Sequence, residues 1–324
     1  MANLKRIAAE VGVSTATVSN ALSGKGRVSK EVVDLIRARA EELGYRPSNA
    51  ARALKTGQSG ILGLVMPDLT NPLFPRIAQM LSISADKNQL GILIADSRGS
   101  ADEQSEALRR LLDRGVDGLI VVPQRGTAPD STAVPMVIIN TDADPLNSVS
   151  ADHVGGGALV AHHIRDIGHR SVVLLGGDPI SEVQQDRIKG MTEALGPDVT
   201  RQVFWGEEGV RRAIEHVRGG TTAILTTSDL LALRVRSELM TARLTVPNHV
   251  SLTGFDDMSF SPVMNPALTT VAQDVEEIAR RAIDIISTRI GGNAHPLEGK
   301  TVPMRLVIRQ STSIAAQPTR RPAT

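Results

Sequence analysis

Residues 4–29, LKRIAAEVGVSTATVSNALSGKGRVS, decide the architecture of the amino-terminal part of the chain. The apolar side chains of a first short helix fall on one face, at Leu4, Ile7, Ala8 and Val11. Gly12 favours the end of that helix, and Ser14 is suited to cap the next one. An interval of about three residues is the turn length of a helix-turn-helix motif.

The second predicted helix, roughly 14–22, has one face suited to base edges. It buries apolar side chains and exposes short ones, which are Thr15, Ala16, Ser19 and Asn20. Hydroxyl groups bond several bases or phosphates, an asparagine pairs with adenine, and alanine touches a thymine methyl. The following loop, 24–27, carries Lys25 and Arg27 and is able to put cations on phosphates.

A third helix is predicted after Ser29. Its apolar face comprises Val32, Leu35, Ile36, Ala40 and Leu43. Gly44 ends it, and Tyr45 is expected to pack back on the helices.

The net charge of +1 hides an asymmetry. Residues 1–60 hold ten basic and five acidic side chains, whereas the remainder holds 26 basic and 30 acidic ones. A cationic module on a mildly anionic body suggests a polyanionic partner for the module alone. A solvated, charge-rich helical surface explains the same numbers equally well.

Residues 46–59, RPSNAARALKTGQS, follow this module. After Pro47 they allow a helix of barely two turns, which is unstable alone in water. Leu54 on that helix, flanked by Arg52 and Lys55, is suited to wedge into a minor groove and bend the duplex. The alternative is a linker helix docked on the larger domain.

From Gly60 onward, short apolar strands alternate with amphipathic helices. Strand-like runs are GILGLVM, LGILIAD, DGLIVVP, PMVIIN, RSVVLLGG, TAILTT and HVSLTGF. Predicted helices are about 102–114, 153–167, 182–195, 207–218, 229–242 and 274–290. This alternation predicts mostly parallel, doubly wound α/β sheets, and about 250 residues favour two such lobes with a ligand cleft between them.

Three successive elements then carry a family resemblance: residues 4–29, then ELGYRPSNAARALKTGQS (42–59), then GLVMPDLTNPLF (63–74). They resemble, in order and spacing, the lactose/galactose repressor family of bacterial transcription regulators. Further matching pieces are VDGLIVVP, DHVGGG, GHRS, DRIKG, TTSDLLALR, VPNHVSLTGFDD, PALTTVAQD and VPMRLVIRQST. The resemblance implies a small all-α DNA-binding head and a core built like a periplasmic sugar-binding protein.

The resemblance also implies residue roles on DNA. Thr15, Ala16 and Asn20 would read bases, and Leu54 would be the wedge of a hinge helix that orders on DNA. The residues serving the backbone or groove edge would be Thr17, Ser19, Lys25 and Arg27.

The implied domains are a head at 1–46, a hinge and linker at 47–59, and an effector-binding and dimerisation core at 60–313. The first lobe would comprise about 60–152 and 274–300, and the second about 153–273 and 301–313. The Pro/Ala/Thr/Arg-rich tail, 314–324, is expected to be disordered.

The resemblance places six effector-binding positions in the cleft: Phe74, Asn140, Arg187, Ser228, Asp256 and Gln273. Core packing is the alternative for Phe74, and a surface ion pair with Asp186 or Glu182 is the alternative for Arg187. Many members have Asn where this chain has Ser228, so the effector cannot be copied from a sugar-binding relative.

Several chemistries are set aside. The chain has no cysteine, no dinucleotide fingerprint, no P-loop and no G-x-S-x-G elbow. No metal-ligand spacing links His162, His163 and His169, and His169 is expected to be structural. We therefore expect no enzyme activity, no metal and no cofactor. No run approaches the about 18 apolar residues of a membrane span, and the start is interpreted as mature sequence.

The sequence thus predicts a transcriptional repressor that binds a palindromic operator as a homodimer. A small molecule, such as a pentose sugar or a nucleoside, would control it from the interlobe cleft. We expect a cytoplasmic protein, associated with the nucleoid when bound to its operator. Alternatives are a solute-binding module without operator specificity and an α/β sugar-modifying enzyme.

Overall fold

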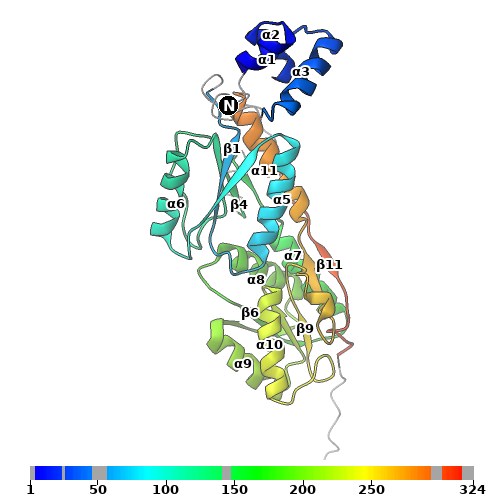
Figure 1. Cartoon of the computed structure of the whole chain (residues 1–324). Helices are drawn as coiled ribbons and strands as arrows, with labels where there is room; N and C mark the ends of the chain where they lie inside the picture. The colour runs from blue at the N-terminus through cyan, green and yellow to red at the C-terminus, as the bar shows by residue number, and fades with distance from the viewer. Residues whose placement is uncertain (1–3, 24–25, 46–56, 141–146, 293–300, 316–324) are drawn as a thin grey trace, which may run out of the picture. The chain divides into compact units, whose positions relative to one another are not determined.

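The structure is a computed structural model that describes all residues except 1–3, 24–25, 46–56, 141–146, 293–300 and 316–324 (Figure 1). It consists of two compact units, Met1–Gly60 and Ile61–Thr324. The predicted hinge helix and most of the predicted tail lie outside the described residues. The finer subdivision of the chain stays a prediction.

The amino-terminal unit contains three helices, α1 (Leu4–Val11), α2 (Thr15–Ser23) and α3 (Lys30–Glu42). Ser14 Oγ accepts from Thr17 N at 3.0 Å, and Ser29 Oγ accepts from Val32 N at 3.4 Å. These bonds confirm both predicted caps. The helices bury a shared core of Ile7, Ala8, Val18, Ala21, Ile36 and Ala40, against which Tyr45 packs as predicted.

The prediction for Leu35 is wrong, because this side chain is 54% exposed. Ile36 and Ala40, one turn apart, fill the contact with α1 and α2. Leu35 precedes Ile36 by one residue and therefore points about 100° away around the helix. An ion pair between Arg39 of α3 and Glu10 of α1 joins the two helices at the surface.

The first lobe is built on a five-stranded parallel sheet in the order β2-β1-β3-β4-β5. Its strands are β1 (Ile61–Met66), β2 (Gly91–Asp96), β3 (Gly118–Val121), β4 (Met136–Ile139) and β5 (Ser148–Val149). Alternate side chains of β1 point to opposite faces of the sheet and pack into two different hydrophobic cores. Leu62, Leu64 and Met66 pack with α5 (Leu73–Lys87) and α11 (Val275–Ile290), whereas Val65 packs with α6 (Ala101–Asp113).

The second lobe has a four-stranded parallel sheet in the order β7-β6-β8-β9. Its strands are β6 (Ser171–Gly176), β7 (Thr200–Trp205), β8 (Ala223–Thr226) and β9 (Ser251–Thr253). Helices α7 (His153–Asp166) and α8 (Glu182–Leu195) cover one face, and α9 (Gly206–Arg218) and α10 (Asp229–Thr241) cover the other. Both sheets are therefore covered on both faces, as the apolar strand runs predict.

Segments that connect the two sheets pair with one another. Ala151 bridges to Val302, and β10 (Thr270–Ala272) pairs with β11 (Arg305–Val307). In each sheet the first strand of the chain order lies between the second and the third, which is a topological switch point. Such sheets bind ligands beyond the carboxyl ends of the strands at that point.

Five elements of the described residues are absent from the prediction: α5, β7 and the short strands β5, β10 and β11. A short 3₁₀ segment, Ser261–Val263, is the remaining regular element. None of the helices in the described ranges is long and apolar enough to span a bilayer.

Candidate functional site

The surface of α2 presents the predicted base readers. Thr15 and Ala16 are exposed in its first turn, and Thr17, Ser19 and Asn20 are half-buried. Thr17 takes part in the helix cap, because its hydroxyl lies 2.9 Å from Ser14 Oγ. This cap fixes the backbone at the start of α2 and therefore the direction in which Thr15 and Ala16 project.

The other predicted DNA contacts are only partly described. Arg27 is exposed. Lys25 and Leu54 lie outside the described residues, so their roles stay predictions. A β-carbon at Gly26, which has φ of +90°, would lie 3.2 Å from the Asn20 amide nitrogen, so the loop passes close to Asn20.

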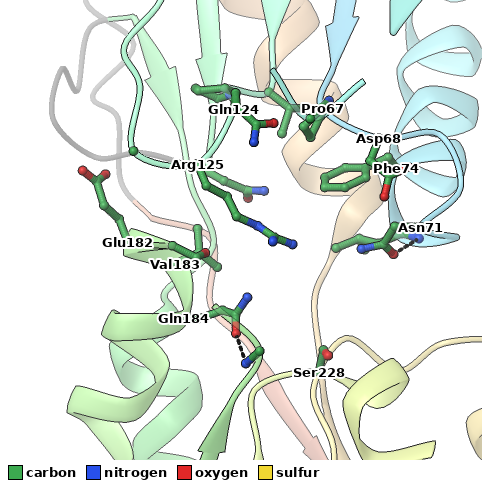
Figure 2. A pocket seen from close by; sticks show the side chains of 18 of the residues that line it. Pro67, Asp68, Asn71, Phe74, Gln124, Arg125, Glu182, Val183, Gln184 and Ser228 are labelled. Carbon is green, nitrogen blue, oxygen red and sulfur yellow. Dashed lines mark hydrogen bonds between the residues drawn. The ribbon is translucent and has the colours of Figure 1, made fainter. Parts of the chain in front are cut away.

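A cleft of about 1100 Å³ lies at the carboxyl ends of the strands of both lobes. Asp68 follows β1, Gln124 and Arg125 follow β3, and Ser228 follows β8. Figure 2 shows Asp68, Phe74 and Asn71 on the first-lobe side, and Gln184 and Ser228 on the second-lobe side. The cleft therefore lies where the topology predicts a ligand site.

The floor of the cleft is a buried ion pair in the second lobe. Arg187 Nη2 lies 2.9 Å from Asp256 Oδ1, and the two side chains are 4% and 6% exposed. Arg187 also donates to Thr227 O at 2.6 Å and stacks over the Phe255 ring at 4.1 Å. Burial raises the pKa of Asp256, and the charge of Arg187 opposes that rise. The alternative of a surface ion pair for Arg187 is wrong.

Two buried polar side chains form hydrogen bonds with this pair. Gln273 Nε2 donates to Asp256 Oδ1 at 2.6 Å. Arg187 Nε donates to His153 Nδ1 at 3.4 Å, and burial together with Arg187 holds the pKa of His153 well below its usual value. A neutral imidazole is the form that accepts this bond. Gln273 therefore orients Asp256 instead of lining the cleft, where it does not appear.

The other predicted effector positions all line the cleft. Ser228 Oγ accepts from Leu231 N at 3.2 Å, so its hydroxyl caps α10 and keeps its proton for a ligand. Asn140 has φ of 66°, and its buried Oδ1 has no donor among the described residues. Phe74 presents an apolar surface and also packs on the first-lobe core.

Sequence reasoning missed several polar side chains in the cleft. Gln184 lies one turn before Arg187 on α8, and its Oε1 accepts from Gly177 N at 2.7 Å and from Thr227 Oγ1 at 2.7 Å. Arg125 Nη1 donates to Asp178 Oδ2 at 3.0 Å across the two lobes. Because Arg125 closely follows a predicted strand, a rule of strand-end polar residues would have found it.

No cluster of His, Asp or Glu within the described part of the chain is arranged to hold a metal ion. His169 is 2% exposed, bonds Thr222 Oγ1 at 2.8 Å and Ser313 O at 3.0 Å, and is structural as predicted.

Comparison with known proteins agrees with this architecture. Residues 3–48 match the family model described as bacterial regulatory proteins, lacI family, and residues 161–312 match a periplasmic binding protein-like domain. The HTH-type transcriptional regulator MalR of Streptomyces coelicolor is 30% identical over 96% of this chain and 97% of that protein. The ribose operon repressor of Haemophilus influenzae is 28% identical over 90% of this chain and 92% of that protein.

The fold likeness extends to solved structures. The lac repressor dimer bound to operator and an anti-inducer is similar with a TM-score of 0.81 at 24% identity, covering 96% of this chain and 99% of that one. A helix-turn-helix head on a two-lobe, periplasmic-binding-protein-like core defines a DNA-binding transcriptional regulator and not an enzyme. The chain belongs to the lacI family of bacterial regulatory proteins. The resemblance and the fold class predicted from sequence are thereby confirmed.

Proposed function

We propose that this protein is a repressor that binds a near-palindromic operator as a homodimer and responds to a small molecule in the interlobe cleft. The proposal is carried by the presence, in one chain, of short side chains at the surface of α2 and of a cleft lined by the buried Arg187–Asp256 pair. The first reads DNA and the second binds hydroxyl groups. The regulator would act in the cytoplasm, on the chromosome.

Exposed apolar side chains support a dimer. The largest on the first lobe are Ile83 of α5 and Ile94 of the edge strand β2, which are 46% and 51% exposed. Leu233 and Met240 of α10 are 41% and 62% exposed. Where exposed apolar side chains form a contiguous patch, they mark a surface that pairs with another chain, and we propose that these four do so. Sedimentation of Leu233→Asp should then shift from dimer toward monomer.

Footprinting tests the DNA half of the proposal. We expect protection of a palindromic site by the wild-type chain and loss of that protection in Asn20→Ala and Leu54→Ala. Gln202→Ala, an exposed change on β7, is the control and should protect the site normally. Salt-sensitive binding without sequence preference would instead support a solute-binding module with a basic anchor.

The effector class we propose is a small neutral polyol, either a pentose sugar or a nucleoside. Asn140, Arg187, Ser228 and Asp256 form a hydroxyl-binding set, and the ribose operon repressor among the relatives is named for a pentose. A thermal-shift panel of sugars, nucleosides and purine bases tests this. Ligand at 100 times its dissociation constant adds about 2.7 kcal/mol of stability. A shift produced only by purine bases or acidic metabolites contradicts the assignment.

A further inference from the structure

The turn that carries Asp256 has an unusual backbone. Asp256 and Asp257 are consecutive non-glycine residues with φ of 105° and 49°. Side chains disfavour this left-handed region, and such residues persist only where surrounding contacts over-determine them. The contacts that hold this turn therefore control where the Asp256 carboxylate points.

Three arginines contact the turn closely, and a fourth, Arg305 of β11, lies 3.8 Å from Asp257 Oδ2. Arg187 binds the carboxylate of Asp256, and Arg309 Nη2 donates to Asp257 Oδ1 at 2.7 Å. Arg76 Nη1 donates instead to the backbone, to Asp256 O at 3.3 Å and Asp257 O at 3.0 Å. The guanidinium of Arg76 is thus bound to the strained peptide units themselves.

The three arginines come from different lobes. Arg187 lies on α8, and Arg309 follows β11 and also donates to Leu268 O, so both belong to the second lobe. Arg76 lies on α5 of the first lobe, two residues after Phe74, which lines the cleft. Only Arg76 among the three depends on how the lobes are arranged.

We propose that Arg76 is a positioning residue that couples the arrangement of the two lobes to the shape of the Asp256–Asp257 turn. When the lobes move apart, its guanidinium leaves the two carbonyls, and the turn loses the contacts that it receives from the first lobe. Linkage makes this reciprocal, so a change in the turn also biases the lobes. The consequence for effector binding rests on the proposed function, whereas the cross-lobe coupling does not.

The test uses the full chain and neither operator nor effector. Because the chain has no cysteine, spin labels attach only at introduced sites, Asp113→Cys on α6 and Glu215→Cys on α9, both exposed. Double electron–electron resonance between the two spin labels then gives the interlobe distance distribution. We expect Arg76→Gln to broaden or shift that distribution, and Arg76→Lys, which keeps the charge on a single donor group, to lie in between.

Hydrogen exchange separates positioning from simple stabilisation. Asp256 N donates to Val271 O at 2.7 Å and Met258 N to Asp229 Oδ2 at 2.7 Å. In Arg76→Gln these two amides should exchange at least about tenfold faster while the sheets keep their protection. General loss of protection, with an unchanged distance distribution, would overturn the proposal.

Two matched variants complete the test. Arg309→Gln loosens the same turn from within the second lobe but keeps the Arg76 contacts between the lobes, so it should accelerate exchange at the turn and change the interlobe distances less than Arg76→Gln does. Arg236 Nη2 donates to Asn265 O at 3.0 Å within the second lobe, and Arg236→Gln should change neither readout. An interlobe change in Arg236→Gln equal to that in Arg76→Gln would refute a specific coupling. Because no ligand is needed, failure here is distinguishable from failure to find an effector.

Discussion

Two arginine–aspartate pairs, each with an arginine that lines the cleft, have nearly the same separation. Arg187 and Asp256 lie 2.9 Å apart with side chains 4% and 6% exposed. Arg125 and Asp178 lie 3.0 Å apart with side chains 48% and 29% exposed. The first pair lies within the second lobe, and the second pair joins the two lobes.

The difference lies in solvent rather than in distance. A buried pair has lost its hydration, so removing one partner leaves an uncompensated charge. An exposed pair exchanges its partner for water at small cost. The Arg187–Asp256 pair is therefore a fixed part of the site in the second lobe, whereas the Arg125–Asp178 pair, which breaks when the lobes move, is exposed to water.

The largest expected effect comes from breaking the buried pair. Arg187→Met should lower the free energy of unfolding by about 3–5 kcal/mol, because Asp256 stays buried without its cation. Urea denaturation measures this loss. The double variant Arg187→Met/Asp256→Asn should recover part of it, since the unpaired charge is gone. A loss under about 1 kcal/mol in Arg187→Met, as for an exposed pair, would erase the contrast drawn here.

A second buried carboxyl sharpens the contrast through pH. Asp229 of α10 accepts from Met258 N at 2.7 Å and from Ser261 Oγ and Thr270 Oγ1 at 2.5 Å. Burial nevertheless raises the pKa of Asp229 to about 6 from an ordinary value of 3.8. The folded state thus holds this proton more tightly than the unfolded state does.

The sign of the pH effect follows from that shift. The contribution of the raised Asp229 pKa to the free energy of unfolding is complete below pH 3.8 and disappears as the pH rises through 6. Relative to Asp229→Asn, the wild type should gain up to about 3 kcal/mol between pH 7 and pH 4. Urea midpoints of both chains across that range measure it, with Asp113→Asn as the exposed control. A pH-independent difference between wild type and Asp229→Asn would show that Asp229 does not titrate there.

The exposed cross-lobe pair should behave in the opposite way. Arg125→Gln and Asp178→Asn should each cost less than about 1 kcal/mol, and their coupling in a double-mutant cycle should shrink in high salt. Denaturation at low and high ionic strength measures this. A salt-independent coupling as large as that of the buried pair would contradict the comparison.

The sequence predicts the regular elements where burial is strong. The continuous apolar runs of β1, β3, β6 and β8 reveal themselves because both faces of their sheets are covered. Strand β7 escaped prediction because it is an edge strand in which only Phe204 is fully buried. Helix α5 escaped because Pro75 in its first turn resembles a break, although proline is tolerated there.

The sequence predicts which residues belong to the site but not which of them bond to one another. Family motifs mark Arg187 and Asp256, yet their bond joins residues of two different elements, and no local pattern encodes it. The grip of Arg76 on the Asp256–Asp257 turn depends on how two lobes meet, which periodicity does not contain. Local sequence thus identifies the side chains of the cleft, whereas the packing of the lobes determines the partners to which they bond.

The smallest expected effect tests whether partial exposure to solvent is enough to make an ion pair contribute little to stability. Glu277 of α11, whose side chain is 27% exposed, binds Arg280 and Arg281 at 2.7 Å within one helix, and these arginines lower its pKa to about 2. Solvent screening should keep its contribution below about 1 kcal/mol, present above pH 4.5 and lost as the pH falls toward 2. Acid unfolding of Glu277→Gln beside Glu276→Gln, its exposed neighbour, measures the difference. A loss as large as that in Arg187→Met would mean that helix geometry, rather than burial, decides the strength of these pairs.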